Sequence, residues 1–247
     1  MLSDNTVLKM HDLRLNAMAE KLREQLESNQ YMDLSFEERI GILVDAEWLS
    51  RRNARLSRLI KTANFTMGDA CVENIEYHTD RELSKPLILK LASCNYIQEN
   101  RNILLLGAAG SGKTYLSNAF GLKAAQNFYS VKYIRLPELF TELAISRGNG
   151  TIRKTLQHYQ QIKLLILDEW LLMPLRDSES RDLLEIIEPR YRKASTIFCS
   201  QINVAGWHEK IGDTLLADAI CDRIVHDSYT IKIGGKDSMR KRKGINE

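Results

Sequence analysis

The sequence predicts an α/β protein in which a parallel sheet is covered by helices and preceded by a small all-helical domain. Residues 1–67 carry apolar side chains at helix-like intervals throughout. From about Gly68 onward, short apolar runs alternate with helical segments, the pattern of a parallel sheet with crossover helices. One of these runs leads directly into a phosphate-binding loop. We therefore expect a helical N-terminal domain over residues 1–67 and an α/β domain over residues 68–247.

The composition is that of an ordinary soluble protein, with 44% hydrophobic and 27% charged residues in a chain of 247. The sequence contains neither a signal peptide nor a run of roughly 18 apolar residues, the length that spans a membrane. Cys199 and Cys221 lie in apolar surroundings typical of reduced, buried thiols, and no His or Cys stands at metal-ligand spacing. These features predict a cytoplasmic protein without a membrane partner.

Three helices are expected in the N-terminal domain. The first covers residues 13–26, and the second begins at a capping box formed by Ser35 and Glu38. The third runs over Arg51–Thr62. In the first two helices the apolar residues recur on one face, as in amphipathic helices. These apolar residues are Leu13, Met18, Leu22 and Leu26, followed by Phe36, Ile40, Leu43 and Val44.

Positive charge is concentrated in two places, although the net charge is only +3. Between residues 51 and 61 there are five cations and no acid, and residues 231–247 contain six cations and two acids. Both stretches are candidate phosphate-contacting surfaces. A charge run is as often a merely solvated face, so both interpretations stay open. The candidate DNA-contacting residues are Arg51, Arg52, Arg55, Arg58 and Lys61.

Five short apolar runs in residues 68–247 are predicted to be strands of the parallel sheet. Segments of helical pattern separate them. Ligands of such sheets bind outside the carboxyl ends of the strands, so the residues after each run are where functional side chains are expected. The runs are Ile103–Leu106, Val131–Leu136, Leu164–Leu167, Thr196–Cys199 and Tyr229–Ile233.

Residues 107–114 match the phosphate-binding motif G-x-x-x-x-G-K-[ST] and stand between a predicted strand and a helical segment, as the motif requires. Glycines let the backbone bend around a phosphate, and the helix N-terminus adds partial positive charge. Lys113 is expected to reach the outer phosphates of ATP, and Thr114 to offer its hydroxyl to Mg²⁺. The alternative is a chance glycine-rich turn. The expected nucleotide-binding residues are Gly107, Ala108, Ala109, Gly110, Ser111, Gly112, Lys113 and Thr114.

Two acids follow the run Leu164–Leu167. Asp168 is expected to hold Mg²⁺ through its water shell, and Glu169 to polarise the attacking water. A solvated Asp-Glu pair after any strand would look identical, so the pair gains weight only from the phosphate loop that precedes it. The two features together predict a nucleoside-triphosphate hydrolase.

Ser200 and Gln201 end the fourth predicted strand. If that strand lies beside the acidic one, one of these side chains faces the γ-phosphate, where an amide can orient water. A capped strand end is the alternative interpretation.

Arg223 ends an apolar helical segment and is a candidate for stabilising transition-state charge in the pocket of a neighbouring subunit. Pairing with Asp222 or Asp218 of its own chain is the alternative. Arg190 and Arg192 are weaker candidates for the same task. Trp207 and His208 have no partner at ligand spacing and are interpreted as a packing corner.

These residues resemble those of the IstB-type transposition helper ATPases, AAA+ proteins encoded beside an insertion-sequence transposase and similar in turn to the DnaC helicase loaders. The resemblance spans nearly the whole chain. Its Ser-Gln, Trp-His-Glu and Ser-Met-Arg elements are much more specific than the phosphate loop. The segments that carry it are residues 13–18, 36–43, 182–187, 200–201, 207–211, 217–223 and 238–241.

The resemblance implies a homo-oligomer that assembles on double-stranded DNA and recruits or activates a transposase. The family usually has Asp-Asp-Trp-Gly after the acidic strand, whereas this chain has a Glu at position 169 and a Leu at position 171. Only 14 residues follow Ile233, so no C-terminal lid domain is expected, and a second sensor would have to come from Arg240 or its neighbours. The resemblance assigns ATP and Mg²⁺ to Gly107, Gly112, Lys113 and Thr114, the acidic pair to Asp168 and Glu169, the first sensor to Gln201 and the trans-acting arginine to Arg223.

Three functions fit these observations. The first is an ATP-dependent, DNA-binding AAA+ helper of insertion-sequence transposition, and the alternative is a DnaC-like replicative helicase loader. The third is a nucleotide-gated binding module without catalysis. Glu169 favours the two ATPases over the third function, because a binding module needs no catalytic carboxylate.

Overall fold

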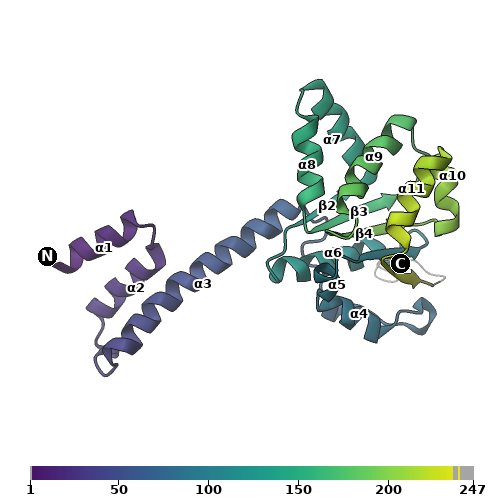
Figure 1. Ribbon diagram of the computed structural model, residues 1–247. Coiled ribbons are helices and arrows are strands. Elements are labelled where there is room, and N and C mark those ends of the chain that lie inside the picture. The colour runs from purple at the N-terminus through teal and green to yellow at the C-terminus, as the bar shows by residue number, and fades with distance from the viewer. Residues whose placement is uncertain (1, 236–238, 240–247) are drawn as a thin grey trace, which may run out of the picture. The chain divides into compact units, whose positions relative to one another are not determined.

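The computed structural model describes residues 2–235 and residue 239, and it divides into two compact units, Met1–Arg58 and Leu59–Glu247 (Figure 1). Within the described residues, no helix is both long and apolar enough to cross a membrane. The two units are taken in turn.

The N-terminal unit is helical, as predicted. It contains α1 (Leu2–Asp12), α2 (Asn16–Glu27) and the 3₁₀ turn η1 (Asn29–Tyr31), and the long helix α3 (Phe36–Ala63) begins in it. The capping box is confirmed, because the Ser35 amide donates to Glu38 Oε2 at 2.7 Å and the Glu38 amide donates to Ser35 Oγ at 3.3 Å. The prediction of separate second and third helices is wrong, since residues 45–50 contain no Gly or Pro and α3 runs through them.

Glu47 on α3 holds α2 in place. One carboxylate oxygen accepts hydrogen bonds from the backbone amides of Ala17 and Met18, at 3.0 and 3.2 Å. These amides belong to the first turn of α2, where helical N–H groups lack partners and an anion is favoured. The other oxygen of Glu47 accepts from Arg51 Nε at 2.7 Å. One acidic side chain therefore caps α2 and pairs with the first arginine of the basic stretch.

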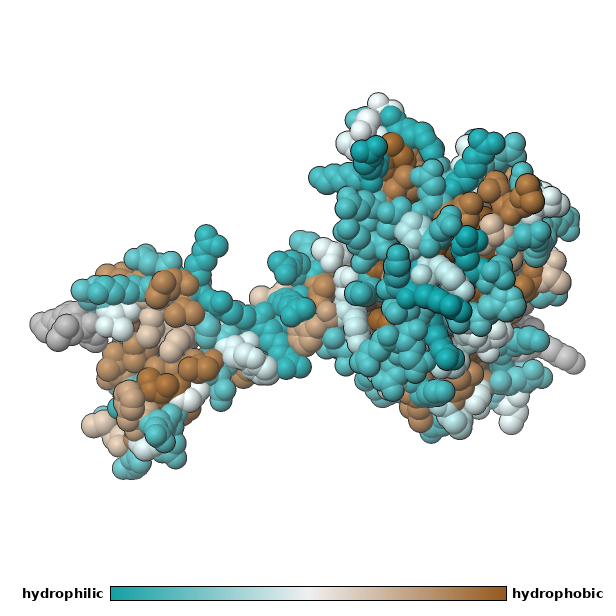
Figure 2. Space-filling view, viewed as in Figure 1, coloured by the Kyte–Doolittle hydropathy of each residue, from teal (hydrophilic) through white to brown (hydrophobic). Residues whose placement is uncertain are grey.

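The predicted apolar face of the second helix is only partly buried. Leu43 is 3% exposed, but Phe36, Ile40 and Val44 are 78%, 39% and 51% exposed. Figure 2 shows apolar surface over this part of the chain. Three helices of this length leave part of the apolar face of α3 in solvent.

The second unit contains the predicted parallel sheet. Its strand order is β2-β3-β4-β1-β5, and all four neighbouring pairs are parallel. All five predicted strands are present, with no bound shifted by more than three residues. The second strand stops one residue short of the prediction, because Leu136 begins a helix with Pro137 in its first turn. The strands are β1 (Asn102–Gly107), β2 (Val131–Arg135), β3 (Leu164–Trp170), β4 (Ser195–Ser200) and β5 (Ser228–Ile233).

Helices cover both faces of the sheet (Figure 1). Against one face pack apolar residues of α7, α8, α9 and α11, which meet the side chains of Leu104, Leu165 and Phe198 in one core cluster. The opposite face is covered by α4, α5 and α6. Among the described residues, no helical domain follows β5. The helices are α4 (Lys85–Ala92), α5 (Asn95–Gln98), α6 (Lys113–Gln126), α7 (Leu136–Gly148), α8 (Ile152–Gln161), α9 (Asp177–Arg190), α10 (Trp207–Ile211) and α11 (Thr214–Val225).

Three aromatic rings form the centre of that core cluster. The ring of Trp170 lies edge-on to Phe198 at 4.6 Å and to Trp207 at 5.6 Å. Trp207 is fully buried, and its indole nitrogen donates to the carbonyl of Ile202 at 3.2 Å. Trp207 is therefore a packing residue, as expected from its lack of chemical partners.

The acidic pair lies at the end of β3, as the sequence predicts, and the strand continues one residue further to Trp170. Leu167 pairs with Phe198 and Trp170 with Ser200, so β3 has one residue more than β4 across this interval. This bulge brings Glu169 to φ 55° and is followed by Leu171 at φ 52°. Bulges of this kind re-aim side chains at the edge of a sheet. The related family has a glycine where Leu171 stands, and the left-handed φ of Leu171 explains why glycine suits that position.

Leu171 is fully buried, so its side chain stabilises the fold while its backbone is strained. We expect Leu171→Ala and Leu171→Gly each to lower the free energy of unfolding by about 2–5 kcal/mol, because each removes a buried side chain. The Gly variant should be the more stable of the two by about 1 kcal/mol, because glycine adopts positive φ without strain. Urea denaturation of both variants measures the difference.

The control is Leu183, which is equally buried but lies in the middle of α9. There the order should reverse, with the Gly variant about 1 kcal/mol less stable than the Ala variant. The same order at both positions would contradict the strained turn.

Candidate nucleotide-binding site

The phosphate-loop residues 107–114 join the end of β1 to the start of α6. Gly110 and Gly112 have φ of 75° and 97°, values that glycine adopts without strain. Gly107 lies against β5, and a β-carbon on it would come within 2.7 Å of the carbonyl oxygen of Ile233. The glycines at these positions are therefore required by the backbone path and by the close approach of two neighbouring strands.

Lys113 is folded back on its own loop. Its ammonium donates to the carbonyls of Gly107 and Ala108, at 2.7 and 2.8 Å, and the residue is 7% exposed. Burial lowers the pKa of Lys113. Close by, the hydroxyl of Ser111 is buried and has no hydrogen-bonding partner among the described residues. A cation held by weak neutral acceptors next to an unpaired donor fits a loop that receives an anion.

Thr114 and Asp168 meet at the carboxyl edge of the sheet. The Thr114 hydroxyl donates to Asp168 Oδ2 at 2.7 Å. Asp168 is 5% exposed, and its other oxygen accepts from the backbone amide of Glu169 at 2.8 Å. A hydroxyl and a carboxylate side by side next to a phosphate loop are the oxygen donors that Mg²⁺ prefers. The residues present therefore fit the cation that the sequence predicts.

Glu169 points away from the core and is partly exposed. Its Oε1 lies 3.7 Å from Nη1 of Arg135, which ends the neighbouring strand β2 and also pairs with Glu138. Arg135 was not predicted from the sequence. The available signal was its position at the end of the strand that pairs with the acidic one, which became usable only when the strand order was known.

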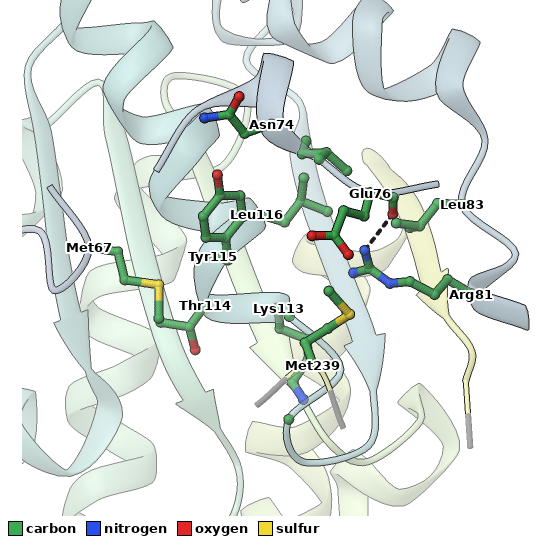
Figure 3. Close-up of a pocket in the computed structure, with 13 residues that line it drawn as sticks. Met67, Asn74, Glu76, Arg81, Leu83, Lys113, Thr114, Tyr115, Leu116 and Met239 are labelled. Carbon is green, nitrogen blue, oxygen red and sulfur yellow. Dashed lines mark hydrogen bonds between the residues drawn. The ribbon is translucent and has the colours of Figure 1, made fainter. Parts of the chain in front are cut away.

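A cavity of about 270 Å³ opens beside the phosphate loop. Figure 3 shows Lys113, Thr114 and Tyr115 of α6 on one side of it, with Glu76 and Arg81 of the preceding chain on the other. Its wall is completed by the irregular segment 67–83, for which the sequence predicted no role. The lining residues are Met67, Asn74, Ile75, Glu76, Arg81, Leu83, Gly110, Gly112, Lys113, Thr114, Tyr115, Leu116 and Met239.

Arg81 ties that segment to the phosphate loop. It is 6% exposed, and it donates to the carbonyl of Ser111 at 2.9 Å and to the carbonyl of Glu76 at 2.6 Å. A β-carbon on Gly112 would lie 2.9 Å from Arg81 Nη2. The glycine therefore also makes room for the arginine that fixes the cavity wall.

The strand order meets the condition set for Ser200 and Gln201. β4 lies between β3 and β1, so the ends of all three strands are adjacent. The Ser200 hydroxyl is buried and donates to the carbonyls of Trp170 and Ile202, at 3.2 and 2.9 Å. Gln201 is exposed. The Ser200 hydroxyl is thus already bonded within the fold, and Gln201 is the exposed side chain of the two.

The three candidate arginines lie in different surroundings. Arg223 on α11 donates to Glu188 Oε1 at 2.9 Å and to the carbonyl of Ala219 at 2.8 Å. Arg192 is exposed and pairs with Asp227 at 3.0 Å. Arg190 is 2% exposed, so it cannot reach a neighbouring subunit, and its candidacy for that task is wrong. Arg240, the candidate second sensor, lies outside the described residues, as does most of the basic stretch 231–247. Of the Ser238–Lys241 element only Met239 is described, and it lines the cavity.

Arg190 joins the end of α8 to the start of β4. Its guanidinium donates to the carbonyls of Tyr159, Ile162 and Ser195 and to the hydroxyl of Thr196. Burial lowers the pKa of Arg190 to about 9, which leaves the side chain charged at neutral pH. The arginine therefore satisfies buried carbonyls that would otherwise lack donors. Among the described residues, no group of three or more His, Cys, Asp or Glu side chains is placed to hold a metal ion.

Comparison with known families and curated proteins gives one consistent result. The family model described as IstB-like ATP binding protein matches residues 8–246. The putative insertion sequence ATP-binding protein y4pL of Sinorhizobium fredii is 36% identical over 243 residues, covering 98% of this chain and 99% of that protein. The IS1162 putative ATP-binding protein of Pseudomonas fluorescens is 40% identical over 202 residues, covering 82% of this chain and 87% of the relative.

Solved structures with the same fold belong to replication proteins. The DnaC helicase loader superposes with a TM-score of 0.55 at 18% identity, covering 67% of this chain and 97% of that chain. DnaA of Aquifex aeolicus, bound to AMPPCP, superposes with a TM-score of 0.57 at 18% identity, covering 70% of this chain and about half, 52%, of DnaA. These likenesses confirm the predicted AAA+ fold.

Because Arg190 satisfies buried carbonyls, we expect Arg190→Met to destabilise the protein by about 3–5 kcal/mol. Arg192→Met is the matched control, since it removes the same charge from an exposed ion pair and should cost less than about 1 kcal/mol. Thermal and urea unfolding measure both. Equal losses of stability would contradict the structural role assigned to Arg190.

Proposed function

This chain belongs to the IstB-like ATP-binding proteins, and we propose that it is an Mg²⁺-dependent ATPase that assists the transposition of an insertion sequence. In this proposal it assembles on double-stranded DNA and recruits or activates the transposase. The observation that carries the ATPase assignment is the contact between Thr114 and Asp168, with Glu169 beside it at the mouth of the phosphate loop. The insertion-sequence relatives support the wider role.

In the proposed reaction, the loop amides and Lys113 bind the phosphates of ATP. The ammonium of Lys113 exchanges its two carbonyl acceptors for phosphate oxygens, which bind a cation more strongly. Thr114 and Asp168 would hold Mg²⁺, which would supply positive charge to offset that of the phosphates. Glu169 orients the attacking water and takes its proton. Gln201 follows β4, the strand between β3 and β1. Its amide orients the same water near the γ-phosphate.

We assign Arg223 to the pocket of a neighbouring subunit. Its ion pair with Glu188 is partly exposed, with side-chain exposures of 26% and 57%, so breaking it costs little. A specific ATPase rate that rises steeply with protein concentration would support shared sites. A rate independent of concentration would exclude them.

DNA binding is assigned to the basic face of α3. Arg51, Arg52, Arg55, Arg58 and Lys61 are all exposed. Arg51 is paired with Glu47, and the guanidinium of Arg52 stacks over the ring of Trp48 at 4.9 Å. Exposed ion pairs of this kind exchange readily for phosphate, so the face remains available to a nucleic acid.

A DnaC-like helicase loader is the second candidate function. The fold likeness to DnaC favours it, but at 18% identity that likeness concerns the fold alone. The relatives that align over nearly the whole chain are insertion-sequence proteins. Capture of a transposase encoded next to this gene supports the first function, and capture of a replicative helicase supports the second.

The ATPase proposal predicts different failures for two variants. Lys113→Ala should weaken ATP binding by about 100-fold, because it removes a charged contact to phosphate. Glu169→Gln should still bind ATP but turn over about 100-fold more slowly or worse, because an amide cannot take the proton of water. Binding of a fluorescent ATP analogue and phosphate release measure the two effects.

The matched controls are Lys123→Ala, on the same helix as Lys113, and Glu185→Gln, an exposed acid on α9. Both should resemble the wild type. Tight ATP binding by Lys113→Ala would refute the loop assignment, and normal turnover by Glu169→Gln would remove Glu169 from catalysis.

The DNA proposal predicts that the double variant Arg55→Gln, Arg58→Gln binds duplex DNA more weakly at every sequence. The slope of log affinity against log salt concentration should fall by about 2, since each phosphate that is no longer neutralised lowers it by about 0.9. Arg153→Gln with Lys154→Gln removes the same charge from the exposed side of α8 and should leave the slope unchanged. An unchanged slope in the first variant would mean that the basic face of α3 is exposed to solvent and does not contact DNA.

A further inference from the structure

Tyr133 is a buried hydroxyl donor that the reaction described above does not use. It belongs to β2, two residues before the strand ends, and it is 2% exposed. Its hydroxyl donates to Asp168 Oδ2 at 2.8 Å, the same oxygen that accepts from Thr114 at 2.7 Å. The backbone amide of Glu169 donates to the other oxygen. Three donors, from β2, α6 and β3, therefore hold this carboxylate from both sides.

The phenol of Tyr133 is itself fixed. Burial raises its pKa, so it is a neutral donor at any physiological pH, and the side chain of Thr66 acts on that pKa in the opposite direction. Thr66 lies between two anchored neighbours. The Met67 amide donates to Asn118 at 3.4 Å, and the ring of Phe65 fills the space where Gly121 and Ile166 lie close together, since a β-carbon on Gly121 would come within 2.5 Å of it.

We propose that Tyr133 is a positioning residue for the magnesium site, orienting the Asp168 carboxylate toward the cation and its water shell. The inference rests on the ATPase function proposed above and deepens it. A carboxylate that acts through water must present a fixed lone pair, because the cation does not hold it directly. Groups that hydrogen-bond to metal-binding carboxylates tune affinity, and their removal costs about tenfold to 100-fold in metal binding.

Removing the Tyr133 hydroxyl leaves Thr114 as the only side-chain hydroxyl on Asp168 Oδ2 among the described residues. That hydroxyl is also the group expected to ligate Mg²⁺. Without Tyr133, the orientation of Asp168 Oδ2 depends on its bond to the Thr114 hydroxyl. The cation and Asp168 then compete for that hydroxyl. With Tyr133 in place, Asp168 keeps its orientation whatever Thr114 does. The effect is therefore specific to the Mg²⁺-bound state and absent from nucleotide binding without the cation.

The test compares Tyr133→Phe with Tyr159→Phe. Tyr159 is equally buried, and its hydroxyl donates to Glu142 at 2.8 Å, between α8 and α7, so the control loses the same kind of bond away from the site. Binding of a fluorescent ATP analogue is titrated with MgCl₂ for the wild type and both variants, and again in EDTA. We expect Tyr133→Phe to need about tenfold more Mg²⁺ for half of the maximal increase in analogue binding. Its affinity for the analogue in EDTA should be unchanged. Tyr159→Phe should match the wild type in both titrations.

Each result has a distinct meaning. If the wild type binds no ATP analogue, the proposed function itself fails. If the wild type responds to Mg²⁺ and Tyr133→Phe responds identically, the positioning role is overturned. Equal weakening with and without Mg²⁺ overturns it too, because that is the mark of a general packing defect. Thr66→Val, at an exposed position, provides a second variant should Tyr133→Phe fail to fold. It should shift the Mg²⁺ titration in the same direction by a smaller factor, and no shift would likewise count against the proposal.

Discussion

The hydrogen bond between Thr114 and Asp168 is the interaction on which the candidate site depends. It joins the first turn of α6 to the bulge in β3, although a whole strand, β4, lies between β3 and β1. The bond is possible because α6, which follows β1 and the phosphate loop, packs against β2, β3 and β4 as well. The Tyr133 hydroxyl and the Glu169 amide donate to the same carboxylate.

The sequence was sufficient to predict the parallel sheet, the phosphate loop and the acidic pair, because each rests on a local pattern with a direct physical cause. The local sequence reveals the glycines that adopt positive φ, the buried apolar strand and the N-terminus of the following helix. The bulge at the acids could not be predicted, because a bulge depends on the pairing of two strands. The left-handed backbone of Leu171 could not be predicted either, since leucine rarely adopts the conformation that glycine adopts freely.

Features that depend on long-range contacts escaped prediction. The cavity wall formed by residues 67–83 has no periodic pattern, and Arg81 donates to the carbonyls of Glu76 and Ser111. Arg190 was a candidate for the pocket of a neighbouring subunit, yet it is among the most buried side chains of the second unit. A buried arginine surrounded by carbonyls leaves no trace in local sequence, because every residue supplies the same backbone acceptor.

The strand order also has a consequence for how the protein is made. β1, which leads into the phosphate loop, lies between β4 and β5, and these neighbours begin only at Ser195 and Ser228. During synthesis the apolar β1 therefore leaves the ribosome long before either of its partners exists, with both of its edges unpaired. The sheet that supports the phosphate loop is therefore completed only near the end of translation. Until then the nascent chain carries an exposed, fully apolar strand, which makes chaperone binding and slow, non-local folding natural features of its biogenesis.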